Sequence, residues 1–135
     1  MLTTEINIHT GHAERVLDIT NHCADFVAVH GDGLLHVFVP HATAGVAILE
    51  IGAGSDDDLL ATLHDLLPPD NRWSHRHGSP GHGRSHVLPA LIPPYATLPV
   101  IAGALALGTW QSICLIDLNL DNPDRRVRLS FIAGG

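Results

Sequence analysis

The sequence predicts one α+β domain over residues 1–135, with a largely antiparallel β-sheet and helices packed on one side. The chain has 135 residues, of which 45% are hydrophobic, which is enough to bury the core of one domain. Strand and helix patterns are mixed in its first half, and strand patterns dominate the second half. This order of elements is typical of α+β proteins, in which helices collect on one face of an antiparallel sheet.

The first predicted elements are a strand, a helix and a second strand. Residues 2–10 alternate between apolar and polar side chains, which is the pattern of a half-buried strand. Apolar residues at helical spacing over residues 16–27 predict a helix that Asp18 or Thr20 caps. Residues 34–39 form a short apolar run that reads as a buried strand and ends at a proline.

The next strand and helix are separated by a glycine-rich turn. Residues 46–51 form the predicted strand, and residues 52–55 form the turn. Leucines on one face then predict a helix that Ser55 caps at its N-terminus and that Pro68 stops. Asp56–Asp58 lie in its first turn, where carboxylates favour the helix dipole. We therefore interpret this acidic run as a helix start and not as a metal site.

The second half of the chain begins with an irregular segment over residues 70–83, where glycine and proline exclude a regular helix. A short helix is predicted over residues 85–92. Strand patterns follow at residues 98–101, at residues 105–118 with a break at Gly108–Thr109, and at residues 126–132. The last of these alternates strictly and predicts a final antiparallel strand.

Composition and charge narrow the function classes. The formal net charge is −7 and all seven basic residues are arginine, which argues against a general nucleic-acid or membrane surface. Cys23 and Cys114 lie in apolar surroundings and are interpreted as buried free thiols, although one disulfide stays an alternative. The N-terminus is no signal peptide, and no apolar run approaches a membrane span. We expect a cytoplasmic protein.

The segment His75–His86 is the first candidate site. It contains His75, His77, His82 and His86 within a glycine-rich loop. Imidazole is the commonest ligand of zinc and similar ions, and three ligands with one open position make a catalytic metal site. The alternative is a solvated surface loop, because eleven histidines in the chain raise the chance of coincidence.

The second candidate is His41, which directly follows a predicted buried strand and is followed by the small residues Ala42, Thr43 and Ala44. This arrangement places an imidazole at a sheet end, where it suits a ligand or a general base. A capped strand end with His41 bonded to a carbonyl is the structural alternative, and it is favoured when the motif is taken alone.

The third candidate is Gly108–Gln111, which lies within the long β-rich stretch. A glycine there indicates a bulge or a close backbone approach, and Trp110 beside Gln111 offers a stacking face and an amide. A bulge with a core tryptophan explains the same pattern. Asp117 and Arg126 are placed to face the same end of the sheet, with Arg126 as a phosphate or carboxylate clamp or as an ordinary exposed arginine.

Together these pieces resemble the YjbQ-like family, whose members are also described as secondary thiamine-phosphate synthase enzymes. The likeness covers nearly the whole chain. It is carried by His41–Ala44 with Glu50, Leu67–Asn71 with Trp73 and His75, Ser85–His86, Leu98–Val100 with Gly103, Leu107–Gln111, and Arg125–Arg126. The chain departs from the family pattern at Trp73, which stands for tyrosine, and at Ala42, which replaces a hydroxyl residue. His77 and His82 are additional to the pattern.

The resemblance implies an α+β homotrimer with a polar pocket at subunit contacts. It implies a divalent metal ion, with zinc as the first candidate, held by His41, His75 and His86. The family description implies the joining of a pyrimidine diphosphate to a thiazole phosphate with release of pyrophosphate. That activity is regarded as secondary, which leaves the physiological reaction open.

Three function hypotheses follow. In the first, an enzyme of the transferase or metal-dependent phosphate-ester type binds a phosphorylated small molecule. There His41 or Glu50 handles a proton and Gln111 orients the substrate, which is bound by Thr43, Thr109, Trp110 and Arg126. In the second, the same histidine pocket is a non-catalytic binding module for a ligand or a metal. In the third, the protein is a purely structural trimer with a solvated histidine loop.

Overall fold

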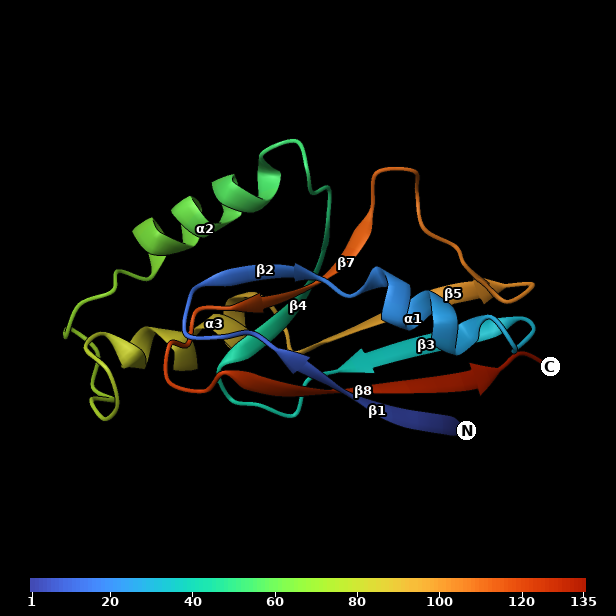
Figure 1. The fold of residues 1–135 in the computed structure, drawn as a ribbon, viewed down its shortest axis with the longest axis horizontal. Helices are drawn as coiled ribbons and strands as arrows, with labels where there is room; N and C mark the ends of the chain where they lie inside the picture. The colour runs from blue at the N-terminus through green and yellow to red at the C-terminus, as the bar shows by residue number, and fades with distance from the viewer.

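The computed structural model describes all residues from Met1 to Gly135 and contains two antiparallel sheets (Figure 1). The five-stranded sheet has the order β1 (Leu2–His9), β8 (Asp124–Ala133), β3 (Gly33–Phe38), β5 (Tyr95–Ile101) and β6 (Ala104–Leu105). The three-stranded sheet has the order β2 (Arg15–Asp18), β7 (Ser112–Asp117) and β4 (Ala44–Leu49). Every strand pair is antiparallel, which confirms this part of the predicted fold class.

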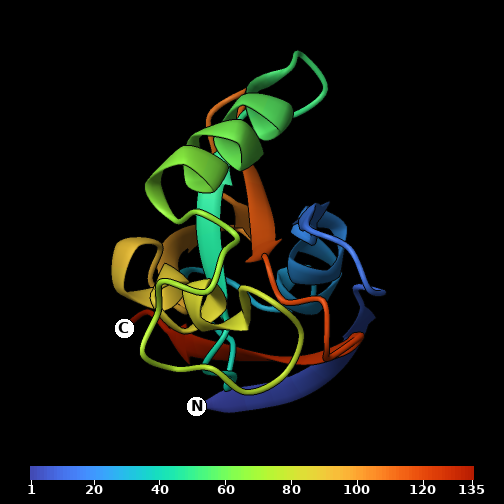
Figure 2. The same cartoon turned by 90° about the vertical axis from the view of Figure 1, so that its left-hand side faces the viewer.

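Three α-helices and one 3₁₀ helix complete the fold: α1 (Thr20–Val27), α2 (Ser55–Leu66), η1 (His82–His86) and α3 (Leu88–Leu91). They lie on one side of the five-stranded sheet, as Figure 2 shows with β1 and β8 at the bottom. The outer face of that sheet is uncovered. The single α+β domain with helices on one side is therefore confirmed. No helix in the structure is long and apolar enough to cross a membrane.

The core has two parts, one on each side of the three-stranded sheet. The larger is a cluster of 15 buried residues from the inner face of the five-stranded sheet, α1 and the facing side of β4 and β7. The smaller is a cluster of six buried residues that joins the other side of β7 to α2 and α3: Leu63, Leu67, Leu88, Cys114, Ile116 and Leu118. This second cluster supports the base of the histidine loop.

The helix predicted over residues 16–27 begins later than expected, at Thr20. Residues 15–18 form β2 instead, because Val16 and Leu17 pair with Ile116 and Leu115 of β7. Sheet pairing across about 100 residues of chain thus overrides the local helical spacing. The predicted capping role of Asp18 is retained in altered form, since its carboxylate accepts the backbone N–H of Thr20 at 2.9 Å.

The β-rich stretch predicted over residues 105–118 is also divided. Residues 106–111 leave the sheets, because β6 pairs with β5 in one sheet and β7 pairs with β2 and β4 in the other. Gly108 therefore lies in a turn and not in a bulge. Gln111 closes this turn: its backbone N–H donates to Gly108 O at 3.1 Å, and its Oε1 accepts the Gly108 N–H at 2.7 Å.

Other local expectations agree with the structure. Asp56–Asp58 occupy the first turn of α2, so the acidic run is a helix start. Gly54 takes the N-cap position in place of Ser55 and has a φ of 104°. Cys23 and Cys114 are both free and buried, and burial raises the pKa of each thiol to about 12.

Candidate metal centre

Four imidazoles converge where the histidine loop meets η1. One ring nitrogen from each of His75, His77, His82 and His86 lies within 4.8 Å of the other three. Nε2 of His82 is 3.0 Å from Nε2 of His86, and Nε2 of His75 is in close contact with Nε2 of His77. Nitrogen ligands bind zinc at about 2.0–2.1 Å. The four nitrogens are therefore close enough together to be candidate ligands of one ion.

Close backbone packing brings the two halves of this group together. A Cβ at Gly83 would lie 2.4 Å from His75 O and 2.5 Å from Trp73 Cβ, so only glycine allows η1 to pass this close to the loop. Trp73 Nε1 donates to Pro68 O at 3.0 Å and fixes the loop at the end of α2. Buried Arg84 holds η1 from the other side, through an ion pair with Glu14 and a 2.7 Å bond to a carbonyl.

The electrostatics of the group favour neutral rings. Partial burial first, and the neighbouring imidazoles second, lower the pKa of His75 and of His86 below the ordinary value of 6.5. Both rings are therefore neutral at pH 7. A neutral imidazole offers the nitrogen lone pair that a metal ion requires, so these two rings could bind an ion at pH 7 without first releasing a proton.

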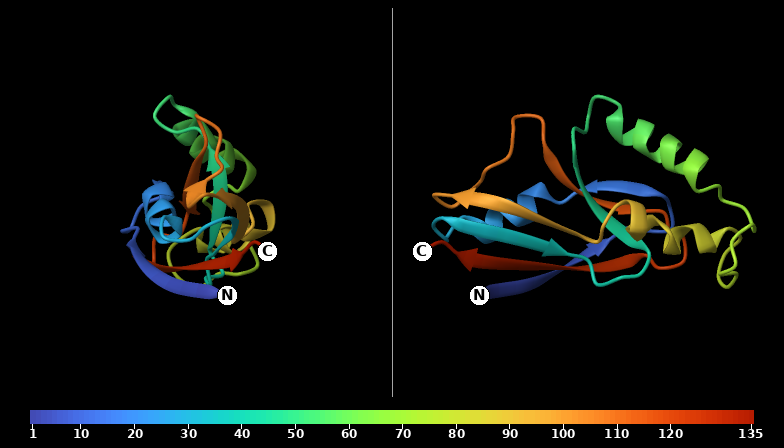
Figure 3. Two further views of the ribbon diagram at one scale, coloured as in Figure 1. Left: turned by 90° about the vertical axis from the view of Figure 1, so that its right-hand side faces the viewer. Right: turned by 180° about the vertical axis from the view of Figure 1, so that it is seen from behind.

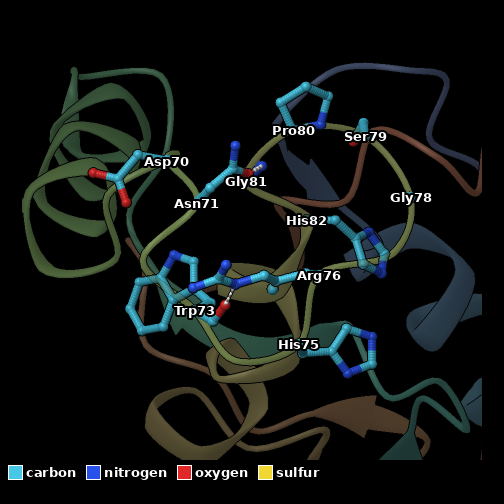
Figure 4. Close-up of a pocket in the computed structure, with 11 residues that line it drawn as sticks. Asp70, Asn71, Trp73, His75, Arg76, Gly78, Ser79, Pro80, Gly81 and His82 are labelled. Carbon is cyan, nitrogen blue, oxygen red and sulfur yellow. Dashed lines mark hydrogen bonds between the residues drawn. The ribbon is translucent and has the colours of Figure 1, made fainter.

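A polar pocket of about 220 Å³ borders the group (Figure 4). Of its 11 lining residues only one is hydrophobic. His75, His82 and the guanidinium of Arg76 all line it, and Arg76 makes no ion pair with an acidic side chain. Figure 4 shows the rings of His75 and His82 on the same side of the loop. The lining also includes the Asp70 carboxylate, which pairs with Arg72 at 2.7 Å, so Arg76 is the lining cation without an acidic partner.

The loop between β7 and β8 forms the second wall of the histidine group. Asp121 in this loop places its Oδ2 2.8 Å from Nδ1 of His82. The same oxygen accepts the backbone N–H of Ser79 at 3.1 Å and its hydroxyl at 3.0 Å. These contacts lower the pKa of Asp121, with the Ser79 N–H as the largest cause, and keep it a carboxylate.

A buried network anchors that loop to the sheets. Arg125 donates to the buried carboxylate of Asp117 through Nε at 2.7 Å and Nη2 at 3.0 Å. Asp117 accepts the backbone N–H of Asn119 at 2.9 Å, and Asn119 Oδ1 accepts the backbone N–H of Asp121 at 2.8 Å. A continuous chain of contacts therefore runs from the interior to the histidine group. Asp117 faces Arg125 and not Arg126, with which the sequence analysis had grouped it.

His41, Thr43 and Arg126 lie together near the start of β4 and β8, outside the group of four histidines. Nε2 of His41 accepts the backbone N–H of Arg126 at 3.0 Å. The hydroxyl of Thr43 is buried, where it accepts bonds from Arg125 at 2.8 Å and from Asn119 at 3.1 Å. The Arg126 guanidinium is more than half exposed, with the Glu5 carboxylate 3.8 Å away.

Glu50 and Gln111 lie at the opposite end of the three-stranded sheet. Leu49 pairs with Ser112, so the residues next to them, Glu50 and Gln111, are neighbours. The exposed residues Thr109 and Trp110 belong to the same turn. The six residues of β4 separate this end from the His41 end by about 20 Å. Figures 1 and 3 place this orange turn far from the yellow-green histidine loop.

The structure therefore distributes the sequence-predicted site residues over three places in one chain. It brings His75 and His86 together, adds His77 and His82 to them, and leaves His41 elsewhere. Sequence reasoning missed Asp121 and Arg84. No local pattern indicates that the Asp121 carboxylate meets a histidine 39 residues earlier in the chain.

Comparison with known proteins gives a consistent result. The family model described as UPF0047 protein YjbQ-like matches residues 4–134. A UPF0047 protein from Mycobacterium tuberculosis is 56% identical over 134 residues, which covers 99% of this chain and 100% of that relative. These two matches include every candidate site residue.

Solved structures agree with this match. A hypothetical protein from Aeropyrum pernix superposes with a TM-score of 0.87 at 31% identity, and the match covers 99% of this chain and all of that one. A YbjQ-like protein of unknown function from Sulfolobus solfataricus has the same fold, with a TM-score of 0.90 at 24% identity over 98% and 97% of the two chains. The architecture of the complete domain is thus shared with crystal structures.

Proposed function

This chain belongs to the YjbQ-like UPF0047 family, and we propose that it is a divalent-metal-binding protein that acts on a phosphorylated small molecule. The observation that carries this proposal is the convergence of four imidazole nitrogens within 4.8 Å of one another beside a polar pocket. Imidazole groups favour zinc, copper, iron and nickel over magnesium and calcium. Zinc is the first candidate because it is the ion most often held by histidines in a tetrahedral arrangement.

The pocket supports an anionic ligand. Arg76 lines it with a guanidinium that no carboxylate neutralises, while its Nε donates to Trp73 O at 2.9 Å and orients the group. Guanidinium binds phosphate oxygens through paired hydrogen bonds. A bound metal ion supplies the charge that polarises a phosphate oxygen or a water molecule in such a site. Arg76 would bind the phosphate on the Trp73 side of the pocket, which the histidine group borders.

Thiamine-phosphate synthase activity is the specific transferase reaction to be tested. It joins two substrates, and the pocket of one chain, about 220 Å³, is smaller than the about 300–1,000 Å³ typical of pockets for drug-sized ligands. One chain therefore suits a single small phosphorylated molecule better than two. A two-substrate reaction requires the site to be enlarged by another copy of the chain.

A homotrimer is the assembly we propose, and the uncovered face of the five-stranded sheet supports it. Register places Leu34 beside Ile132 and Phe38 beside Tyr95 on that outer face. These four side chains are 44%, 49%, 38% and 52% exposed. Apolar patches of this kind on a sheet are commonly covered by a partner. A second copy of the chain is the partner we propose, because it could also bring together motif residues that lie far apart within one chain.

Those motif residues act on one substrate only if they come from different copies. His41 and Arg126 lie about 20 Å from Glu50 and Gln111 along β4, and neither pair belongs to the histidine group. In a trimer, His41 or Glu50 of one copy handles a proton and Gln111 orients the substrate, with Thr109, Trp110 and Arg126 as further contacts beside a neighbouring histidine group.

The experiment is elemental analysis of the protein purified without an affinity tag or chelator, with His86→Ala alongside. We expect about one zinc or other transition-metal ion per chain in the wild type and its loss in the variant. His22→Ala, which removes an exposed histidine of α1, is the matched control and should keep the metal. Unchanged metal content in His86→Ala contradicts the assignment of His86.

A non-catalytic binding module is the second candidate, and the small size of the pocket favours it. It predicts metal binding and ligand binding without turnover. A panel of phosphate esters, together with the two thiamine-phosphate synthase substrates, distinguishes the two functions. Metal-dependent release of phosphate or pyrophosphate, abolished in His86→Ala, supports an enzyme. Binding without release on the whole panel supports the module.

A further inference from the structure

We infer that Asp121 is a positioning residue that holds His82 as a fourth ligand of the histidine centre. The inference rests on the proposed metal site and adds to it a residue from a distant loop. The β7–β8 loop thereby becomes part of the metal centre, although it contains no ligand of its own.

The geometry around His82 carries the inference. Its side chain is only 7% exposed, and Asp121 Oδ2 lies 2.8 Å from Nδ1. The contact is short but does not have hydrogen-bond geometry, and Nδ1 has no hydrogen-bond partner in the structure. Nε2, on the opposite side of the ring, lies 3.0 Å from His86 Nε2. The carboxylate thus meets one nitrogen while the other enters the group.

A carboxylate behind a histidine has a defined chemical effect. It favours the tautomer with the proton on the nearer nitrogen, leaves the lone pair on the farther nitrogen, and raises the basicity of the ring as a ligand. His82 therefore presents the Nε2 lone pair to the ion. Four histidines would fill the tetrahedral coordination of a zinc ion, so a substrate oxygen would have to add to it as a fifth ligand, an expansion that zinc sites can make.

Asp121 is itself fixed in position. Ser79 donates to it through its backbone N–H and its hydroxyl, and Asn119 Oδ1 fixes its backbone N–H. A Cβ at Gly78 would lie 2.7 Å from Asp121 Oδ2, so the loop around His82 is shaped to admit this carboxylate. A group held by three contacts restricts His82 to one orientation, which lowers the entropy lost when the metal binds.

The experiment is a Co²⁺ titration of the metal-free protein, followed by the visible spectrum of the bound ion. Asp121→Ala should weaken Co²⁺ binding by about 10- to 100-fold, the usual effect of losing such a partner. It should also change the spectrum, because a loosened His82 alters the coordination geometry. Asp121→Asn keeps the shape and one acceptor oxygen, so it should restore part of the affinity.

Two control variants separate positioning from loop anchoring. Asp124→Ala removes a carboxylate that contacts His9 Nδ1 at 2.9 Å on the surface, and it should leave Co²⁺ affinity unchanged. Ser79→Ala removes one anchor of Asp121 but leaves the carboxylate beside His82, so it should shift affinity much less than Asp121→Ala. An equal loss in both variants would show that loop anchoring, and not the carboxylate, sets the affinity.

The outcomes distinguish this inference from the proposed function. A wild-type protein that binds no Co²⁺ and no Zn²⁺ overturns the metal site and the role of Asp121 with it. A wild-type protein that binds the ion, with the same affinity and spectrum in Asp121→Ala, overturns the role of Asp121 alone. Loss of affinity with a changed spectrum in Asp121→Ala, and neither in Asp124→Ala, supports it.

Discussion

The guanidinium of Arg125 and the carboxylate of Asp117 form a fully buried ion pair, joined through Nε at 2.7 Å and Nη2 at 3.0 Å. The pair also holds Thr43 and, through Asn119, the loop that contains Asp121. Of the two adjacent arginines that resemble the family motif, Arg125 is thus structural and Arg126 is the exposed one.

Removing one member of this ion pair should strongly lower the free energy of unfolding. Arg125→Met leaves the Asp117 carboxylate buried without its partner, and we expect it to lower the free energy of unfolding by about 3–5 kcal/mol. Arg128→Met removes a surface arginine paired with Glu5 at 2.9 Å and should cost only about 0–1 kcal/mol. Urea unfolding measures both. Equal losses in the two variants would contradict a buried structural role for Arg125.

Gly83 should be intolerant of a side chain. Gly83→Ala places a Cβ against His75 O and Trp73, so it should lower the free energy of unfolding by about 1–3 kcal/mol through overpacking and weaken metal binding by separating η1 from the loop. Gly31→Ala is the matched control, because nothing lies within 4 Å of its Cβ position. Thermal unfolding and a Zn²⁺ titration compare the two, and wild-type metal affinity in Gly83→Ala would be inconsistent with this packing.

The uncovered sheet face predicts an effect on assembly. Light scattering at micromolar concentration should give three times the chain mass for the wild type and a smaller mass for Leu34→Asp, because a carboxylate on that face cannot be buried without cost. Val29→Asp, at a side chain that is 84% exposed between α1 and β3, should leave the mass unchanged. A wild-type mass of one chain would rule out the trimer.

The His41 contact predicts a pH dependence. Burial, followed by the charges of Arg125 and Arg126, lowers the His41 pKa from 6.5. The unfolded chain therefore takes up this proton first as the pH falls, and stability is lost as the pH falls from about 6.5 to the lower folded pKa. The stability difference between wild type and His41→Gln should shrink over that interval.

Urea unfolding of wild type and His41→Gln at pH values between 7.5 and 5 measures how the stability difference changes. His22→Gln, which replaces an exposed histidine of α1, is the matched control for the histidine-to-glutamine change itself. An NMR titration that gives His41 a pKa of 6.5 or higher would refute the prediction.

Much of the fold could be predicted from local patterns. Alternation over residues 2–10 and 126–132 predicted β1 and β8, which pair along their length. The leucine spacing and acidic start predicted α2. Local patterns failed at residues 16–17 and 106–111, where the partner strand and the change of sheet decide the conformation. Such pairings join residues far apart in the chain, and no local window contains them.

Some features of the candidate site could likewise be predicted from the sequence, and others could not. The sequence by itself determined the α+β class, the histidine-rich loop as the place of interest and the family resemblance, because these depend on composition, periodicity and motif order. Only the tertiary structure decided that four histidines converge, that His41 lies apart from them, and that Asp121 stands behind His82. Each of these depends on how loops that are distant in sequence pack together. Close approaches at glycines and the buried Arg125–Asp117 pair hold these loops in position.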